Sequence, residues 1–183
     1  VRLGHAAGTV SGAVETTSNV VRAAIQIIGK SDDAQIISSC FLMYPNSNYP
    51  MAHSDCGLVI DPTEDELASI AVMAADSCKN LLQAEPRLAM LSFSTKGSAS
   101  HSKVSKVVAA TKIVKTKNPE IQIDGELQFD TAISPEIAKS KADGSPTAGK
   151  ANVMIFPNLD AGNIGYKITQ RLGGAEAIGQ ILQ

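Results

Sequence analysis

The residues best suited to chemistry lie in the stretch LSFSTKGSASHS, where a glycine stands among hydroxyl groups and a lysine. Around Gly97 are Ser92, Ser94, Thr95, Lys96 and Ser98. Hydroxyl groups and free backbone N–H groups, together with an ammonium group, suit the binding of an anion. The spacing G-x-x-x-x-G-K-[ST] of a Walker loop is missing, so a flexible polar loop is an equally good interpretation.

The stretch GAVETTSNVVR suggests a second anion site. Thr16 and Thr17 stand at the predicted start of a helix, and Arg22 follows just over one turn later. A helix N-terminus with hydroxyl groups and a nearby arginine can hold a phosphate. On residue types alone, an N-cap followed by a surface arginine is the better interpretation.

A third candidate is the turn IFPNLDAGNIGYK, from Ile155 to Lys167. It runs from an apolar strand through polar residues and spaced glycines into a predicted helix. This layout often cradles an anionic ligand, but it also fits an ordinary strand-to-helix corner.

The other ionisable groups show no catalytic spacing. Three acids in IDGELQFDTA could act as a base or bind a metal, but acids in a loop are usually just solvated: Asp124, Glu126 and Asp130. The histidines lie apart, without ligand spacing or a Ser or Cys partner: His5, His53 and His101. The cysteines show no C-x-x-C spacing: Cys40, Cys56 and Cys78. We therefore expect no catalytic triad, no disulfide framework and no metal site.

The composition is that of a globular protein. Of the 183 residues, 44% are hydrophobic and 19% are charged, which argues against disorder. The net charge of -2 and the lack of basic clusters with stacking aromatics exclude a nucleic-acid partner. No apolar run is long enough to cross a bilayer and no signal peptide is visible, so we expect no membrane partner and a cytoplasmic location with reduced thiols.

Predicted strands and helices alternate along the chain. Helices are expected near 16–28, 63–83, 103–118, 134–141 and 161–172, and strands near 35–44, 58–61, 87–94, 121–125, 151–157 and 175–183. Residues 45–57 have the turn formers of an exposed connection. A capping box of Thr63 with Glu66 and the pair Ser134-Pro135 begin two of the helices.

The strands are apolar runs, which is typical of an α/β class protein: a three-layer α/β/α domain with a mostly parallel (mixed) sheet. Ligands of such sheets bind beyond the carboxyl ends of the strands. Those ends read MYPNS, SFSTKGSAS, IDGELQFD and FPNLDAGN, and all are polar. Polar loops are ordinary there, so by themselves they leave ligand binding open.

Three segments closely resemble phosphate acetyltransferases: SGAVETTSNVVRAAIQII, AMLSFSTKGSASH and the whole stretch from Ile123 to Gln183. The resemblance covers essentially all 183 residues in the same order. It implies an acyltransferase that interconverts acetyl-CoA plus phosphate with acetyl phosphate plus CoA, with CoA as a substrate and no cofactor or metal. It also implies a homodimer whose fold is similar to isocitrate and isopropylmalate dehydrogenases, with two α/β/α domains around a cleft. Residues 1–30 would end the first domain, and residues 31–183 would form nearly all of the second.

The same resemblance assigns substrate-binding residues. Thr16, Thr17 and Arg22 match the family's hydroxyl pair and arginine on the phosphate side. The residues that match cleft-facing turns, without an assigned role, are Ser94, Thr95, Gly97, Asp160, Gly162 and Asn163. The core side of the last turn would be held by Ile155, Phe156 and Ile164.

The sequence also departs from the family. The family's segment N-D-L-S-R-G supplies a serine and an arginine at the reacting centre, with a proposed base aspartate shortly after, and it is expected just beyond Gln183. The catalytic residues are therefore unknown, and we expect the isolated chain to be inactive. Family aspartates are replaced by His5 and Ala7, a histidine by Glu15 and a proline by Gln180.

An alternative function follows from these departures. Related domains fused to some malic enzymes are regulatory acetyl-CoA-binding modules without transferase activity. Glu15 beside a phosphate site would repel the substrate unless its carboxylate points away, so a regulatory domain stays a second hypothesis.

Overall fold

The computed structural model describes residues 1–30, 34–46 and 49–183, which form two compact units, Val1–Ala34 and Gln35–Gln183. The domain boundary predicted after residue 30 falls beside residues 31–33, which lie outside the described part of the chain. The two units are described in turn.

The described residues of the first unit, 1–30 and 34, contain one helix, α1 (Thr17–Ile27), as the sequence predicts. The side chain of Thr16 is the N-cap and accepts a hydrogen bond from the Asn19 amide at 3.4 Å. No residue of α1 is buried. Its apolar side chains therefore add little hydrophobic stabilisation within this unit.

The second unit is built on a six-stranded sheet with the order β4-β3-β5-β2-β1-β6. The strands are β1 (Ser39–Tyr44), β2 (Met51–Ser54), β3 (Arg87–Leu91), β4 (Gln122–Leu127), β5 (Val153–Ile155) and β6 (Glu176–Leu182). Neighbouring strands from β4 to β2 are parallel, whereas β1 is antiparallel to both β2 and β6. The predicted α/β class with a mostly parallel, mixed sheet is confirmed.

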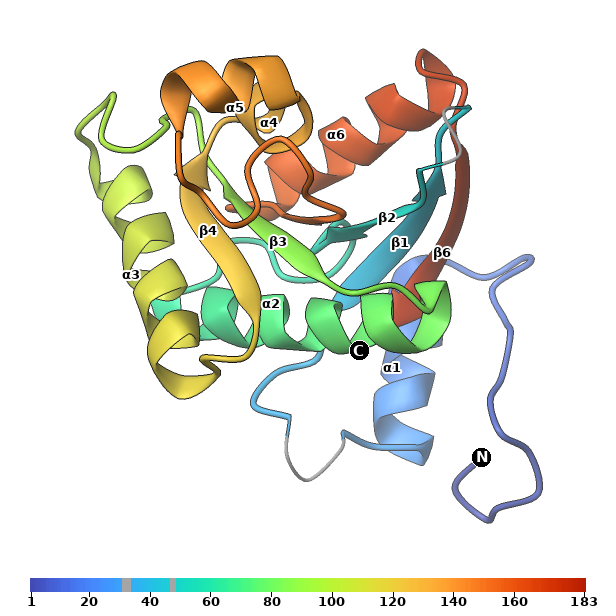
Figure 1. Ribbon diagram of the computed structural model, residues 1–183. Helices are drawn as coiled ribbons and strands as arrows, with labels where there is room; N and C mark the ends of the chain where they lie inside the picture. The colour runs from blue at the N-terminus through green and yellow to red at the C-terminus, as the bar shows by residue number, and fades with distance from the viewer. Residues whose placement is uncertain (31–33, 47–48) are drawn as a thin grey trace. The chain divides into compact units, whose positions relative to one another are not determined.

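Helices cover both faces of this sheet (Figure 1). One face carries α2 (Glu64–Ser77), which continues into a π-helical turn (Cys78–Leu82), and α3 (Ser102–Lys117). The other carries α4 (Phe129–Ile133), α5 (Pro135–Lys141) and α6 (Leu159–Arg171). The unit therefore has the three layers that the alternation of strands and helices predicts.

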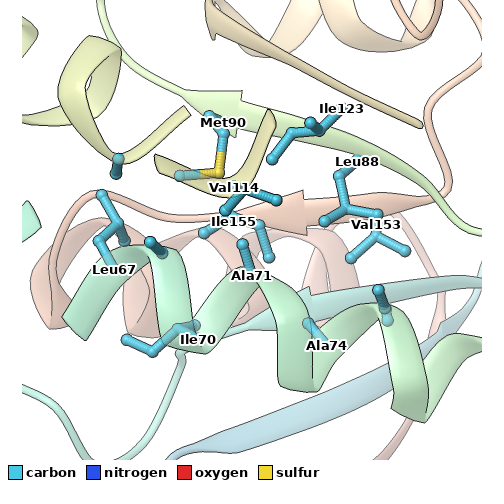
Figure 2. Packing of buried hydrophobic residues seen from close by; sticks show 14 of the residues in the cluster. Leu67, Ile70, Ala71, Ala74, Leu88, Met90, Val114, Ile123, Val153 and Ile155 are labelled. Atoms are coloured by element: carbon cyan, nitrogen blue, oxygen red, sulfur yellow. The ribbon is translucent and has the colours of Figure 1, made fainter. Parts of the chain in front are cut away.

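Alternate residues of the central strands enter the two cores, because successive side chains of a strand point to opposite faces. Leu88 and Met90 pack toward α2, where they meet Leu67 and Ala71 (Figure 2). Ala89 belongs to the core on the opposite face. Both cores consist of buried apolar side chains, which explains why these strands are apolar throughout.

The predicted helix starts are confirmed. Thr63 and Glu66 form a complete capping box, with the Thr63 amide donating to the Glu66 carboxylate at 2.8 Å and the Glu66 amide donating to Thr63 Oγ1 at 3.3 Å. Ser134 caps α5 and Pro135 is its first residue. Both motifs satisfy N–H groups that a helix start would otherwise leave without a partner.

Two predictions about the segment 45–61 are wrong. The stretch predicted as an exposed connection contains the fully buried strand β2, and the strand predicted at residues 58–61 is absent. The physical reason is Asp55, whose carboxylate accepts hydrogen bonds from the amides of Leu58 and Val59 at 2.9 and 3.4 Å. These bonds hold the two amides in a turn, so they are not available to a sheet.

One side chain expected in the core lies at the surface. Ile164 is 57% exposed, although its helix forms as predicted. Gly162 is the only buried residue of α6, so most of this helix's apolar face is not covered. Over residues 1–30, 34–46 and 49–183, no helix combines the length and the apolarity that a membrane crossing needs.

Candidate functional site

The carboxyl ends of the parallel strands bring three polar loops to one edge of the sheet. These loops follow β2, β3 and β5, and the residues after β4 join them. Residues 43–46 of the segment MYPNS, predicted to belong there, lie at the opposite edge, and Ser47 lies outside the described residues. The reason is that β1 is antiparallel to its neighbours and Met43 pairs with Met51 at the start of β2. The edge formed by the carboxyl ends of β2, β3, β4 and β5 is where ligands bind in α/β sheets.

The loop after β3 is folded around the carboxylate of Glu126. Ser94 Oγ and the Gly97 amide donate to the same oxygen, Glu126 Oε1, at 2.8 and 2.7 Å. The Lys96 amide donates to the Glu126 backbone carbonyl at 3.2 Å. Two of the donors predicted to meet an anion therefore already have an anionic partner inside the protein.

Thr95 is also engaged within the protein. Its Oγ1 accepts a hydrogen bond from the Gln128 amide at 2.8 Å and lies 3.4 Å from Thr131 Oγ1. Ser94 and Thr95 are both buried, whereas Lys96, Gly97 and Ser98 are exposed. The exposed tip is therefore the part of the loop that is open to a ligand.

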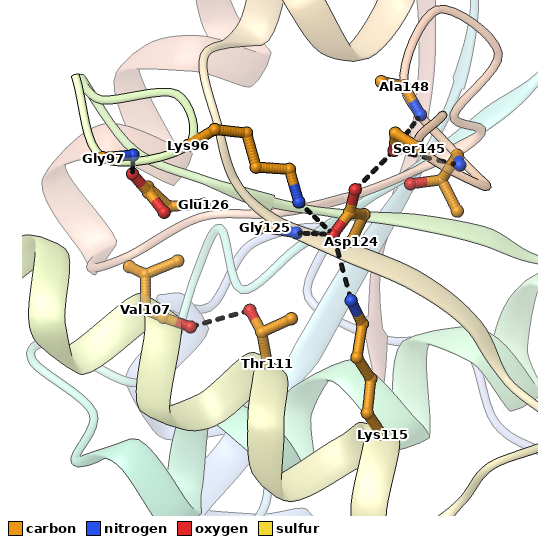
Figure 3. Close-up of polar contacts among 11 residues, drawn as sticks. Lys96, Gly97, Val107, Thr111, Lys115, Asp124, Gly125, Glu126, Ser145 and Ala148 are labelled. Atoms are coloured by element: carbon orange, nitrogen blue, oxygen red, sulfur yellow. Dashed lines mark hydrogen bonds and ion pairs between the residues drawn. The ribbon is translucent and has the colours of Figure 1, made fainter. Parts of the chain in front are cut away.

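Beside the tip, the buried carboxylate of Asp124 collects several donors (Figure 3). Lys96 Nζ and Lys115 Nζ approach Asp124 Oδ1 at 2.6 and 3.1 Å, and Ser145 Oγ donates to Oδ2 at 2.5 Å. Burial raises the pKa of Asp124, but the hydrogen bonds from Lys96, Ser145 and Lys115 outweigh it, so the pKa lies below its usual value. Asp124 is therefore an anion at neutral pH that ties the loop to α3 and to the segment after α5.

The corner between β5 and α6 packs against the turn that follows β2. Asn158 caps α6 by accepting from the Ala161 amide at 3.0 Å, and Asn163 Nδ2 donates to the Cys56 carbonyl at 3.1 Å. Gly162 is buried, whereas Asp160 is exposed in the first turn of the helix. Ile155 and Phe156 lie in the cores as expected, but Ile164 does not.

Sequence reasoning missed the turn after β2. Asp55 is 3% exposed. Its carboxylate accepts hydrogen bonds from the Ser39 amide at 3.1 Å, from Ser39 Oγ at 2.8 Å and from the Gly57 amide at 2.7 Å. The amides of Leu58 and Val59 also donate to it, as described above. The signal was the pattern S-D-C-G, in which an aspartate precedes a glycine by two residues, as in a turn closed by an aspartate side chain. Asp55 thereby fixes β1, β2 and the turn between β2 and α2.

Replacing Gly162 with alanine is expected to lower the free energy of unfolding by about 2 kcal/mol, because a Cβ there would lie 2.1 Å from the Asp55 carbonyl oxygen. Gly165→Ala is the matched control in the same helix, since its Cβ would meet only the side chain of Phe156. Urea unfolding of both variants checks this. A Gly162→Ala variant that is as stable as the natural chain would show that the corner can move aside.

In the first unit, two of the three predicted phosphate residues, Thr16 and Arg22, belong to a small polar network at the start of α1. Thr16 Oγ1 lies 3.1 Å from Ser18 Oγ, and Arg22 Nη1 donates to Asn19 Oδ1 at 3.5 Å. Asn19 Nδ2 in turn donates to a Glu15 carboxylate oxygen at 2.8 Å. Thr17 is the first residue of the helix and is exposed. Glu15 is therefore linked to Arg22 through Asn19.

The three cysteines are unsuited to nucleophilic chemistry. The three cysteines are free and buried, and burial raises the pKa of Cys40 and of Cys78 to about 11 and that of Cys56 further still. These thiols are protonated at neutral pH and are poor nucleophiles. Within the described part of the chain, no three His, Cys, Asp or Glu side chains are arranged to hold a metal ion.

Known proteins match the chain over its full length. Residues 1–183 match the family described as "Phosphate acetyl/butaryl transferase". The chain is 52% identical to a phosphate acetyltransferase of Paracoccus denitrificans, over 100% of the chain and 59% of that protein. It is 53% identical to one of Thermoanaerobacterium thermosaccharolyticum, over 100% of the chain and 57% of that protein. The chain thus spans little more than half the length of these relatives.

Solved structures agree with this comparison. A phosphotransacetylase from Streptococcus pyogenes is similar with a TM-score of 0.94 at 49% identity, over 100% of the chain and 55% of that protein. A branched-chain phosphotransacylase from Enterococcus faecalis V583 shares the fold with a TM-score of 0.76 at 23% identity. The likeness to dehydrogenases stays a prediction.

Proposed function

Because the chain belongs to the phosphate acetyl/butaryl transferase family, we propose that the protein containing it interconverts acetyl-CoA plus phosphate with acetyl phosphate plus CoA. The observation that carries this is the match over residues 1–183, together with about 50% identity to phosphate acetyltransferases. Because the chain spans 59% and 57% of those relatives, the activity belongs to the longer protein.

In this proposal the reaction is acyl transfer from the sulfur of CoA to a phosphate oxygen, without a separate cofactor. Such transfer requires that two anionic partners be held together and that the oxyanion formed at the carbonyl be stabilised. Arg22 and the α1 N-terminus with Thr16 and Thr17 are suited to the phosphate, because a guanidinium group and free helix amides both favour an anion. The exposed loop tip, together with Asp160 at the start of α6, would line the cleft.

The remaining assignments are part of the same proposal. Residues 1–30 would end a first domain and residues 31–183 would form most of a second, in a cytoplasmic homodimer. Ser94, Thr95, Gly162 and Asn163 would then shape the cleft wall from within, since each is buried or bonded to the protein itself. The residues that carry out the chemistry are expected outside this chain.

An assay of acetyl phosphate formation from acetyl-CoA and phosphate tests the function. We expect turnover from the longer protein and none from the 183-residue chain alone. No turnover by the longer protein would overturn the proposed activity, and turnover by the chain alone would overturn the assignment of the catalytic residues to other segments.

One observation keeps a regulatory function as a second candidate. Glu15, where the family usually has histidine, is tied through Asn19 to Arg22, so a phosphate at Arg22 would have to compete with a carboxylate nearby. A longer protein that binds acetyl-CoA in calorimetry but forms no acetyl phosphate would support this second function.

A further inference from the structure

A buried carboxylate at the end of β4 shapes the loop after β3. We propose that Glu126 is a positioning residue, which holds the loop from Ser94 to Ala99 in the shape that the transferase reaction needs. This proposal rests on the proposed function, since it assigns a role within the same site.

The hydrogen bonds of Glu126 span the whole loop. Its Oε1 accepts from Ser94 Oγ at 2.8 Å and from the Gly97 amide at 2.7 Å, and its backbone carbonyl accepts from the Lys96 amide at 3.2 Å. Ser94 Oγ accepts in turn from the Ala99 amide at 3.0 Å. One carboxylate oxygen therefore closes the loop from both sides, with hydrogen bonds that its charge strengthens.

The strand itself aims Glu126 at the loop. Met90 on β3 pairs with Gly125 on β4, but the next residue, Leu91, pairs with Leu127. Glu126 is therefore an extra residue on β4, as in a β-bulge, which commonly re-aims a side chain beside a functional site. A Cβ at Gly125 would lie 2.5 Å from Met90 Cβ, so this close approach of the two strands requires glycine.

The burial pattern indicates support of the loop more than contact with substrate. Glu126 is 3% exposed and Ser94 is fully buried, whereas Lys96, Gly97 and Ser98 are exposed at the tip. Lys96 and Gly97 both have positive φ values, 49° and 81°, so the backbone needs several contacts to keep this conformation. Glu126 provides contacts to both residues.

Two variants separate positioning from acid–base chemistry. Glu126→Ala leaves Ser94 Oγ and the Gly97 amide without their acceptor, whereas Glu126→Gln keeps an amide oxygen of the same reach. Glu120→Ala changes an exposed glutamate just before β4 and is the matched control. Hydrogen exchange of the Gly97 amide in the 183-residue chain measures the contact directly, and kinetics of the longer protein measure its effect on the reaction.

For Glu126→Ala, we expect Gly97 exchange to become at least about tenfold faster and kcat/KM to fall about 10- to 100-fold, with the shape of the pH profile unchanged. Glu126→Gln should recover most of the slow Gly97 exchange and most of kcat/KM, and Glu120→Ala should change neither quantity. If Glu126→Ala does not fold, Gly97 exchange in Glu126→Gln is the test. Exchange somewhat faster than in the natural chain supports the proposal, and unchanged exchange contradicts it.

Three results would overturn the proposal. They are unchanged Gly97 exchange in Glu126→Ala, faster exchange with unchanged kinetics, and loss of activity in Glu126→Gln as severe as in Glu126→Ala with a limb of the pH profile missing. The last result would make Glu126 an acid or base. Failure of the proposed function is distinct, because the longer protein with its natural Glu126 would then show no turnover.

Discussion

Replacing Asp55 with alanine is expected to lower the free energy of unfolding of the second unit by about 3 to 5 kcal/mol. The carboxylate is buried and accepts five hydrogen bonds, from the amides of Ser39, Gly57, Leu58 and Val59 and from Ser39 Oγ. Without it, these donors lose their acceptor in a place that water reaches poorly. The cost of donors left without partners makes this the most damaging single change we expect.

Urea unfolding measures this loss, with two reference variants. Asp55→Asn should lose an intermediate amount of unfolding free energy. Its amide oxygen can still accept from the three donors to Oδ1, whereas its NH2 group faces the two donors to Oδ2 and cannot accept from them. Asp143→Ala, at an exposed loop position, should change the free energy by less than about 0.5 kcal/mol. A loss below about 1 kcal/mol in Asp55→Ala would mean that the turn reorganises around other acceptors.

The second large effect is a loss of stability in acid caused by His53. This imidazole is fully buried, and burial lowers its pKa to about 4. Its Nδ1 has no hydrogen-bond partner among residues 1–30, 34–46 and 49–183, and its surroundings include the rings of Phe129 and Phe156 and the sulfur of Met51. The unfolded chain therefore takes up the proton first, so stability is complete above the ordinary pKa near 6.5 and falls as the pH drops toward 4.

Between pH 7 and pH 4, His53 should cost about 3 kcal/mol of unfolding free energy, from the difference between the two pKa values. Urea unfolding across this range checks the slope. His53→Leu should remove most of it, whereas His5→Gln, at an exposed position, should not. The carboxylates with lowered pKa, Asp124 among them, lose their contribution only at lower pH. An unchanged slope in His53→Leu would assign the acid sensitivity to other groups.

Local interactions made part of the fold predictable from the sequence. The capping box of Thr63 and Glu66 and the Ser134-Pro135 start depend on residues a few positions apart, so they can be recognised without the tertiary structure. The apolar runs at β3 and β5 likewise identified strands buried on both faces.

Interactions between distant residues explain what the sequence could not reveal. The turn formers around β2 concealed a strand, because its burial depends on β1 on one side and on β5, far along the chain, on the other. The antiparallel direction of β1 cannot be recognised from its apolar sequence, so the pattern predicts the loop after β1 at the edge opposite to the one where it lies.

In the candidate site, the sequence identified the loop around Gly97 but not its internal partner. The sequence pattern suggests that Asp124 and Glu126 are solvated loop residues, whereas both are buried acceptors on a strand. The residue types show which groups of the loop could bind an anion. The pairing of β4 with β3 places Glu126 beside the loop, so Ser94 Oγ and the Gly97 amide already donate to its carboxylate.

The strand order also has a consequence for how the chain is assembled. The hairpin of β1 with β2 and the β3-α3-β4 unit each form from neighbouring segments, but β5 lies between them in the sheet. Ala52 of β2 pairs with Val153 of β5, roughly a hundred residues later in the chain. During synthesis from the N-terminus, we therefore expect the β1–β2 hairpin and the β3-α3-β4 unit each to keep one strand edge unpaired until β5 has been synthesised. Pairing of β5 with β2 and β3 then joins the two units into one sheet.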